Sequence, residues 1–344
     1  MSEPLDLTYL VPVRWRDGAQ RAELAAYLGE IAPRCAETIV VDGSPPEVFA
    51  ANAAAWGRYA THIPPDPGEG FLMGKVSGVR TGVRAASRER VVIADDDVRY
   101  DLGALERMAR LLDRHDLVRP QNYFAALPWH ARWDTARTLL NRSLGRDYPG
   151  TLGVRRSCLL AIGLYDGDVL FENLELIRTV GAAGGRIAAP LDLYVARVPP
   201  SAAHFWGQRT RQAYDDFALP ARMALWLAVL PLLALDRRFS VPGVRKGALP
   251  RRRGTAAAAA LAIALAELGR RRAGGAARFP ATSSLLAPLW VLERGVCAWL
   301  AVLQRLRFGG VRYGDSVIPI AAHSQRQLRD RVREAAAAPG PPGY

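Results

Sequence analysis

Residues 90–98 read RVVIADDDV, a short apolar run followed at once by three aspartates. The run has the length and the β-branched content of a buried strand. Three adjacent carboxylates repel one another, so a cation or a hydrogen-bonded ligand is needed to compensate them. A divalent cation shared with substrate phosphates is the usual compensation. For these residues alone, a solvated turn or a helix N-cap, where aspartate is common, is an equally good interpretation.

Similar apolar runs alternate with helical patterns through the first 200 residues. Strands are predicted at residues 7–13, 38–41 and 90–94, and helices at residues 18–30 and 74–87. This alternation predicts an α/β fold with a mostly parallel sheet. Ligands bind such sheets at the carboxyl ends of the strands. Asp42 and the Asp95–Asp97 run both follow predicted strands, so we expect them at the same edge of the sheet.

Several motifs, taken in order, resemble those of the family 2 glycosyltransferases, which have a GT-A fold. The run DDD resembles the family's D-x-D motif, with Asp95 and Asp97 as its outer acids. Further elements resemble the family over about residues 7–217: LVPVRW at 10–15, VDGS at 41–44, Gly74-Lys75 with Gly78 and Gly82, and YPGTLG at 148–153 followed by Arg155-Arg156. The resemblance implies an inverting glycosyltransferase with a GT-A-like, Rossmann-like nucleotide-sugar domain.

The resemblance also implies roles for individual side chains. Asp42 would accept hydrogen bonds from the nucleobase, and Asp95 would hold the ribose or base side of the donor. Asp97, together with Asp95, would hold a divalent metal, Mn²⁺ or Mg²⁺, that neutralises charge on the departing diphosphate. Lys75 would add a point charge near the phosphates. An ordinary surface lysine is an equal alternative for Lys75.

The motif expected to supply the general base departs from the family pattern. Where the family has Glu-Asp, this chain has Glu172-Asn173. An amide cannot take the proton of an acceptor hydroxyl, so Asn173 is excluded as the base. Glu172 is the first candidate because a carboxylate can act as a general base. Glu175, about one helical turn further on, is the second candidate.

A second departure lies in the family's Q/R-x-x-R-W motif. Gln208 and Arg211 match its first and fourth positions, but Gln212 stands in place of the tryptophan. The resemblance places Gln208 and Arg211 in donor binding, with the planar fork of Arg211 facing the diphosphate. In the resembling families, such as ceramide glucosyltransferases and hopanoid-associated transferases, this motif lies where the catalytic domain meets the membrane.

The charge of the chain is divided unevenly along its length. Residues 1–216 hold 26 Lys and Arg against 27 Asp and Glu, whereas residues 217–344 hold 20 against 6. The basic part also contains three apolar runs, at residues 218–235, 255–268 and 284–303. A basic and apolar segment favours a membrane surface over nucleic acid. We expect helices in the membrane interface, with the first and third runs as candidate spans; a soluble helical domain is the alternative.

These patterns predict three parts: a catalytic domain at 1–216, a basic, membrane-associated helical region at 217–310, and a tail at 311–344 whose end is disordered. The predicted partners are a nucleotide-sugar donor, a lipid or glycan acceptor and membrane lipids. The N-terminus lacks the pattern of a signal peptide, so we expect the catalytic domain at the cytoplasmic face of the membrane. Two alternatives remain: a sugar-phosphate nucleotidyltransferase, and a degraded, non-catalytic transferase that serves as a membrane adaptor.

Overall fold

The computed structural model describes residues 3–239, 253–314 and 316–337. The chain divides into two compact units that interleave along the sequence. The sheet unit comprises the residues up to Asn122, Tyr148–Val198 and the residues from Ala322 onward. The helical unit comprises Tyr123–Asp147 and Pro199–Ala321. This division differs from the boundary expected at residue 216, because residues 123–147 and 199–216 pack with the C-terminal helices.

A seven-stranded sheet forms the centre of the sheet unit, in the order β3-β2-β1-β4-β8-β6-β9. The strands are β1 (Leu5–Val13), β2 (Cys35–Asp42), β3 (Thr61–Ile63), β4 (Arg90–Ala94), β6 (Leu117–Val118), β8 (Thr151–Arg155) and β9 (Ile187–Ala188). The pairs β1–β2, β1–β4, β2–β3 and β6–β9 are parallel, whereas β8 runs antiparallel to β4 and β6. The predicted α/β class and mostly parallel sheet are therefore confirmed.

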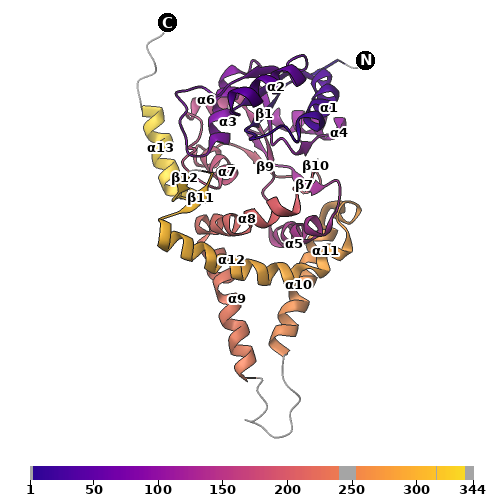
Figure 1. Cartoon of the computed structure of the whole chain (residues 1–344), viewed down its shortest axis with the longest axis vertical. Coiled ribbons are helices and arrows are strands. Elements are labelled where there is room, and N and C mark those ends of the chain that lie inside the picture. The colour runs from indigo at the N-terminus through magenta and orange to yellow at the C-terminus, as the bar shows by residue number, and fades with distance from the viewer. Residues whose placement is uncertain (1–2, 240–252, 315, 338–344) are drawn as a thin grey trace. The chain divides into compact units, whose positions relative to one another are not determined.

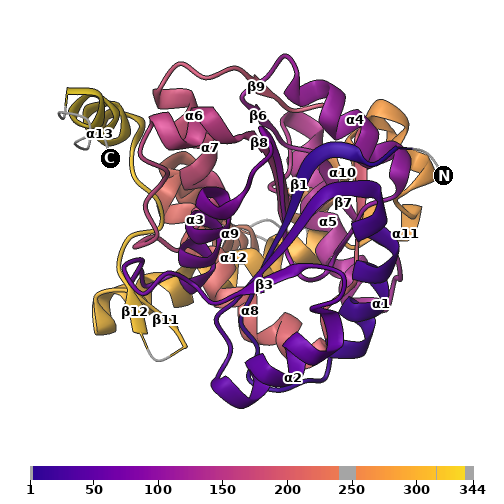
Figure 2. The same cartoon turned by 90° about the horizontal axis from the view of Figure 1, so that it is seen from above.

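Helices cover both faces of this sheet. They are α1 (Arg21–Ile31), α2 (Pro46–Trp56), α3 (Gly74–Ala85), α4 (Leu102–Leu112), α6 (Arg156–Ala161), α7 (Glu172–Ala182) and α13 (Gln325–Ala337). Figure 2 shows α1 and α4 on one side of the central strands and α3, α6 and α7 on the other. A Cβ at Gly82 would meet the Leu10 side chain at 2.2 Å, so this glycine lets α3 lie close against β1.

A smaller sheet lies beside the strand ends, in the order β5-β10-β7. Its strands are β5 (Val98–Arg99), β10 (Tyr194–Arg197) and β7 (Gln121–Phe124). The pair β5–β10 is antiparallel and sets Arg197 opposite Val98. The smaller sheet thus brings a residue near position 200 next to the aspartates that follow β4.

The helical unit contains α5 (Trp129–Leu144), α8 (Ala202–Tyr214), α9 (Pro220–Phe239), α10 (Arg253–Arg271), α11 (Ala281–Leu285) and α12 (Ala287–Phe308), followed by the hairpin β11 (Val311–Tyr313) and β12 (Ser316–Ile318). Figure 1 shows α12 lying across the ends of α9 and α10. The three predicted apolar runs are helical, as expected. Within the described ranges, no helix is both long enough and apolar enough to cross a membrane, so the structure does not support the first and third runs as spans.

The end expected to be disordered is AAAAPGPPGY at residues 335–344; its first three residues are the last of α13 (Gln325–Ala337), and residues 338–344 lie outside the described residues. Earlier in the tail, the described residues form the hairpin of β11 and β12 and then helix α13. Helix α13 packs against α7 of the sheet unit. His323, just before α13, is buried, and its backbone N–H donates to the Glu175 carboxylate of α7 at 2.8 Å.

Candidate functional site

The carboxyl ends of β1 and β2 lie side by side, with Val13 opposite Asp42 in the register. Asp42 is buried, and its carboxylate accepts hydrogen bonds from the Ser44 N–H at 2.9 Å and from Asn52 Nδ2 at 2.8 Å. His62 Nε2 lies 3.1 Å from the same carboxylate. Burial alone would raise the pKa of Asp42, but these hydrogen bonds outweigh burial and lower it. Asp42 is therefore a charged anchor for the loop after β2.

A cavity of about 630 Å³ opens beside Asp42. Apolar rings and proline side chains form much of its wall, and residues of the first turn of α3 also line it. Its lining includes Arg14, Phe49, Pro64, Pro65, Phe71, Gly74 and Ser77. The Phe49 ring stacks on His62, with 4.2 Å between the ring centroids. Apolar walls with a few polar groups are typical of sites that hold a flat, partly polar ligand.

Lys75 joins two carboxylates from different elements. Its ammonium nitrogen lies 2.5 Å from Asp95 Oδ1 and 2.6 Å from Glu172 Oε1. Lys75 is the second residue of α3, Asp95 follows β4, and Glu172 is the first residue of α7. Burial would lower the pKa of Lys75, but the two carboxylates outweigh it and raise the pKa well above its ordinary value. The predicted base and the predicted donor-binding residues thus share one charged cluster.

Asp97 forms a two-point ion pair with Arg197. Both carboxylate oxygens accept from Arg197 Nε, at 3.0 and 3.1 Å, and one also accepts from Nη2 at 2.6 Å. Between these acids, Asp96 accepts a hydrogen bond from Trp15 Nε1 at 2.5 Å. Burial raises the pKa of Asp96, although the Trp15 hydrogen bond opposes the shift. Each acid of the DDD run therefore has its own protein partner.

This arrangement does not fit the expected divalent metal. A metal of this kind needs several oxygen ligands with accessible lone pairs. Both carboxylate oxygens of Asp97 accept hydrogen bonds from Arg197. The Asp95 carboxylate contacts Lys75, and its Oδ2 lies 3.9 Å from Arg197 Nη2. Among the residues that the structure describes, no three His, Cys, Asp or Glu side chains gather as a metal-binding group. The two predicted metal ligands are instead compensated by two cationic side chains.

Glu175, the second candidate base, is not part of this cluster. Its side chain is fully buried, and its carboxylate accepts from the backbone N–H of His323 at 2.8 Å and lies 2.8 Å from His323 Nδ1. Asn173, which stands where the family has aspartate, donates from Nδ2 to the Pro149 carbonyl at 3.0 Å. Glu175 therefore anchors the segment before α13, and Asn173 anchors the segment before β8.

Gln208 and Arg211 lie on α8, in the helical unit. Gln208 accepts a hydrogen bond from Gln212 Nε2 at 3.3 Å, and the Arg211 guanidinium lies 5.0 Å from the centre of the Tyr313 ring. Neither contact tests a role in donor binding. That role stays a prediction.

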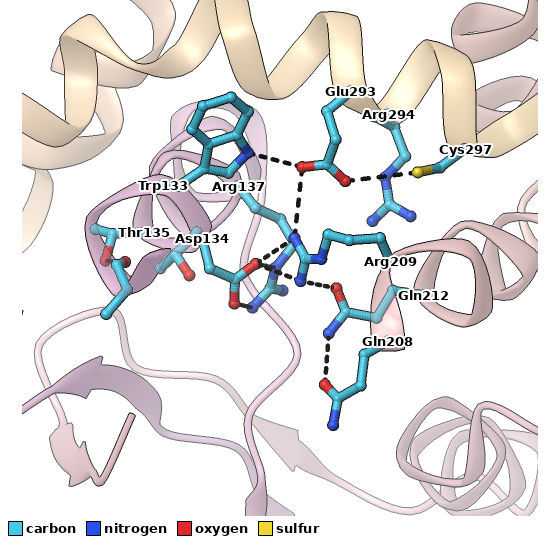
Figure 3. A network of polar contacts seen from close by, with 12 residues as sticks. Trp133, Asp134, Thr135, Arg137, Gln208, Arg209, Gln212, Glu293, Arg294 and Cys297 are labelled. Atoms are coloured by element: carbon cyan, nitrogen blue, oxygen red, sulfur yellow. Dashed lines mark hydrogen bonds and ion pairs between the residues drawn. The ribbon is translucent and has the colours of Figure 1, made fainter. Parts of the chain in front are cut away.

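The intervening Arg209 is the buried residue of this motif. It pairs with Asp134 of α5 at 3.1 Å and approaches Glu293 of α12 at 3.7 Å, while Trp133 Nε1 donates to Glu293 at 2.7 Å (Figure 3). Glu293 interrupts an apolar run, and this interruption was the only sequence signal of the network. Sequence reasoning did not find Arg209 or Asp134.

Sequence reasoning also missed the partners of the acids in the sheet unit. His62, Trp15 and Arg197 each contact an aspartate that lies 20 to 100 positions away in the chain. No short motif contains both members of any of these pairs. The one available signal was β10 itself (Tyr194–Arg197), a short apolar strand that ends in Arg197.

The chain is therefore an α/β protein with a charged cluster and an apolar-walled cavity at the carboxyl ends of its parallel strands. No protein-family model matches the chain, and no curated protein matches it either. Among solved structures, it is similar to a glucosyl-3-phosphoglycerate synthase from Mycobacterium tuberculosis in complex with Mn²⁺, uridine diphosphate and glucosyl-3-phosphoglycerate: 17% identity, TM-score 0.41, covering 58% of this chain and 74% of that chain.

It is also similar to a mannosyltransferase from Pyrobaculum calidifontis in complex with GDP-Man and Mn²⁺. That similarity has 18% identity and a TM-score of 0.44, and it covers 98% of this chain and 87% of the other. Both similarities are distant.

Proposed function

We propose that this protein is an inverting glycosyltransferase with a GT-A-like sheet unit, which moves a sugar from a nucleotide-diphosphate donor to a hydroxyl acceptor. One observation carries the proposal: Lys75 joins Asp95 and Glu172 in one cluster at the carboxyl ends of the parallel strands. Ligands of such sheets bind at this edge. The order of the motifs, from VDGS through DDD to Glu172, supports the same assignment.

The cavity beside Asp42 is the proposed site for the nucleobase. Asp42 is buried, and Ser44, Asn52 and His62 hold its carboxylate beside this cavity. The wall formed by Phe49 and the prolines suits the flat ring. Arg14 and the N–H groups at the start of α3 lie at the same cavity and favour the negative charge of a diphosphate.

Glu172 is the proposed general base. In a single displacement, the acceptor oxygen forms a bond to the anomeric carbon while the bond from that carbon to the diphosphate oxygen breaks. The proton of the acceptor hydroxyl passes to Glu172, and the electron pair of the broken bond leaves with the diphosphate. Glu172 suits this role because it is a carboxylate beside the donor residue Asp95, with Lys75 fixing both.

The test compares Glu172→Gln with Glu106→Gln, an exposed glutamate of α4 that pairs with Arg110. Removing a general base typically lowers turnover by 100-fold or more, so we expect about a 100-fold loss for Glu172→Gln and none for Glu106→Gln. Turnover is measured as release of nucleoside diphosphate from a panel of sugar donors with lipid extract as acceptor. Normal turnover by Glu172→Gln would remove this residue from the mechanism.

We further propose that the acceptor is a lipid or a lipid-linked sugar, used at the cytoplasmic face of an anionic membrane. Helix α12 supports this because one of its faces is apolar and exposed, at helical spacing: Leu289, Leu292, Val296, Trp299, Leu300 and Leu303. Exposed leucines on α9 and α10 extend the apolar surface. The part of the chain from residue 217 onward carries 20 basic against 6 acidic residues, which suits anionic headgroups.

Vesicle flotation tests the membrane proposal. We expect the protein to float with vesicles of phosphatidylcholine and phosphatidylglycerol, and less with phosphatidylcholine alone, because its basic charge is attracted to anionic lipid. The double variant Leu292→Glu/Leu303→Glu should stay in the unbound fraction. Leu144→Glu, at an exposed leucine of α5, is the matched control and should float normally. Equal flotation of both variants would refute docking through α12.

A further inference from the structure

The two acids expected to hold a metal are each fixed to a positive charge instead. Arg197 reaches both oxygens of Asp97, the closest at 2.6 Å, and Lys75 lies 2.5 Å from Asp95. A divalent ion at this position would have to displace a guanidinium and an ammonium or sit beside them. Either arrangement places like charges close together, which is unfavourable.

The backbone holds Arg197 in this position. Strand β10 pairs with β5, so Arg197 lies opposite Val98, the residue that follows Asp97. The next backbone N–H, that of Val198, donates to the Asp97 carbonyl at 2.8 Å. The ion pair between Arg197 and Asp97 is thus supported by hydrogen bonds on both chain segments. Arg197 is therefore a fixed part of the site.

Gly150 makes room for the cluster. A Cβ at this position would lie 2.6 Å from Asp95 Oδ2 and 3.0 Å from Arg197 Cζ. The Gly150 N–H is held by Asn122 Oδ1 at 2.7 Å, and its carbonyl accepts from the Asp95 N–H at 2.9 Å. The backbone of the segment before β8 therefore comes close to Asp95 and Arg197 because residue 150 has no side chain.

We propose that Arg197 and Lys75 supply the positive charge that a divalent cation would supply to the diphosphate, so that donor binding and transfer need no metal. Arg197 contacts Asp97 through Nε and Nη2, and Lys75 contacts Asp95, so both cations are held where the donor phosphates would bind. Arg and Lys are established groups for stabilising phosphate charge. The inference rests on the proposed transferase function and names the residues that replace the metal in it.

The first measurement uses the full chain after treatment with EDTA. We expect donor turnover to stay within about two-fold of the value with added Mn²⁺. Titration with Mn²⁺ alone, followed by the electron paramagnetic resonance signal of the free ion, should show no stoichiometric binding. If EDTA abolishes turnover, Mn²⁺ restores it and the protein binds one Mn²⁺, the inference is overturned while the transferase function stands. If no donor is turned over with or without metal, the transferase function itself fails and the inference fails with it.

The second measurement uses Arg197→Gln, which keeps hydrogen-bonding groups but removes the charge. Loss of one fixed group that stabilises transition-state charge typically costs 100-fold or more, so we expect about a 100-fold loss of turnover in EDTA. Because Asp97 then loses its partner, Mn²⁺ should bind to the variant and restore part of the turnover. Arg107→Gln, at a partly exposed arginine that pairs with Asp192, is the matched control and should behave as the unchanged protein.

The thermal melting temperature of each variant shows whether a loss of turnover comes from a loss of folding. If Arg197→Gln melts at a much lower temperature than the unchanged protein, Arg197→Lys replaces it, since lysine keeps the charge but loses the two-point geometry. Turnover of Arg197→Lys in EDTA should then fall between those of the unchanged protein and of Arg197→Gln. Normal turnover of either folded variant in EDTA would overturn the role of Arg197.

Discussion

Asn173 shows how one amide can take a position where a catalytic acid is expected. Its Nδ2 donates to the carbonyl of Pro149, which precedes Gly150. Gly150 in turn accepts from the N–H of Asp95. Asn173 therefore positions the backbone beside the charged cluster and has a structural reason to be an amide.

Asn173→Asp is accordingly expected to harm the protein, although it restores the acid found in the resembling family. The new carboxylate would face a carbonyl oxygen, and the lost hydrogen bond leaves that carbonyl unsatisfied. Such losses cost about 1–3 kcal/mol, so the free energy of unfolding in urea should fall by about that amount. Asn173→Ala, which removes the bond without adding repulsion, should lose less. Turnover of Asn173→Asp above that of the unchanged protein would instead assign the base to position 173.

Single acids of the sheet unit could be picked from the sequence, but their partners could not. Asp42, Asp95, Asp97, Lys75 and Glu172 stand in short motifs, and the structure places them near the carboxyl ends of the strands. Whether an acid binds a metal or an arginine depends on a contact made by a distant segment. The pair of Asp97 with Arg197 forms only because β10 joins β5 across about 100 residues.

Single helices and strands could likewise be predicted from the sequence, but their packing partners could not. The predicted strand at 90–94 is β4, and the predicted helix at 74–87 is α3, because local spacing of apolar residues determines both. The sequence did not show which helices pack together. Helix α5, from the middle of the chain, packs most closely on α10, where a Cβ at Gly269 would lie only 1.9 Å from the Leu139 carbonyl.

The buried ion pairs between α5 and α8 make the helical unit sensitive to acid. Burial alone would raise the pKa of Asp134, but Arg137 and Arg209 outweigh it and hold the pKa well below the ordinary value of 3.8. The unfolded chain therefore binds the proton more readily than the folded protein does. The stabilisation is fully present above that ordinary value and is lost as the pH falls below it.

Asp134→Asn should remove this stabilisation and its pH dependence. Breaking a buried ion pair by removing one partner typically costs about 3–5 kcal/mol, because the arginines stay buried without their counter-charge. We expect that loss at neutral pH, and a flatter fall in stability than in the unchanged protein below about pH 4. Asp192→Asn, at an exposed acid paired with Arg107, should change stability by less than about 1 kcal/mol. Equal effects of the two variants in urea unfolding would contradict the buried network.

The charge division along the sequence suggested a boundary near residue 216. The helical unit instead continues through that position, from Pro199 to Ala321, and the sheet unit includes the residues from Ala322 onward. Composition reports what a segment is made of, but not which earlier segment covers it. Arg142 of α5 is fully buried and donates to the carbonyls of Gly269, at 3.2 Å, and Arg272, at 2.8 Å. An arginine in the neutral part of the sequence thus belongs to the basic helical unit.

This interleaving predicts that a chain ending at residue 216 does not fold as an independent domain. Truncation there removes α10 and α12 from α5 and α8, which exposes apolar surface and leaves the Arg142 guanidinium without the carbonyls that it donates to. It also removes His323 and leaves the fully buried Glu175 without its partner. We expect the 1–216 chain to bind a hydrophobic dye strongly, to elute as aggregates and to unfold in urea without a cooperative transition, whereas the full chain in the same detergent-containing buffer unfolds cooperatively. A monomeric 1–216 chain with a sharp urea transition would show that the sheet unit is complete without the C-terminal segments, and that the boundary drawn from charge is the true end of the catalytic domain.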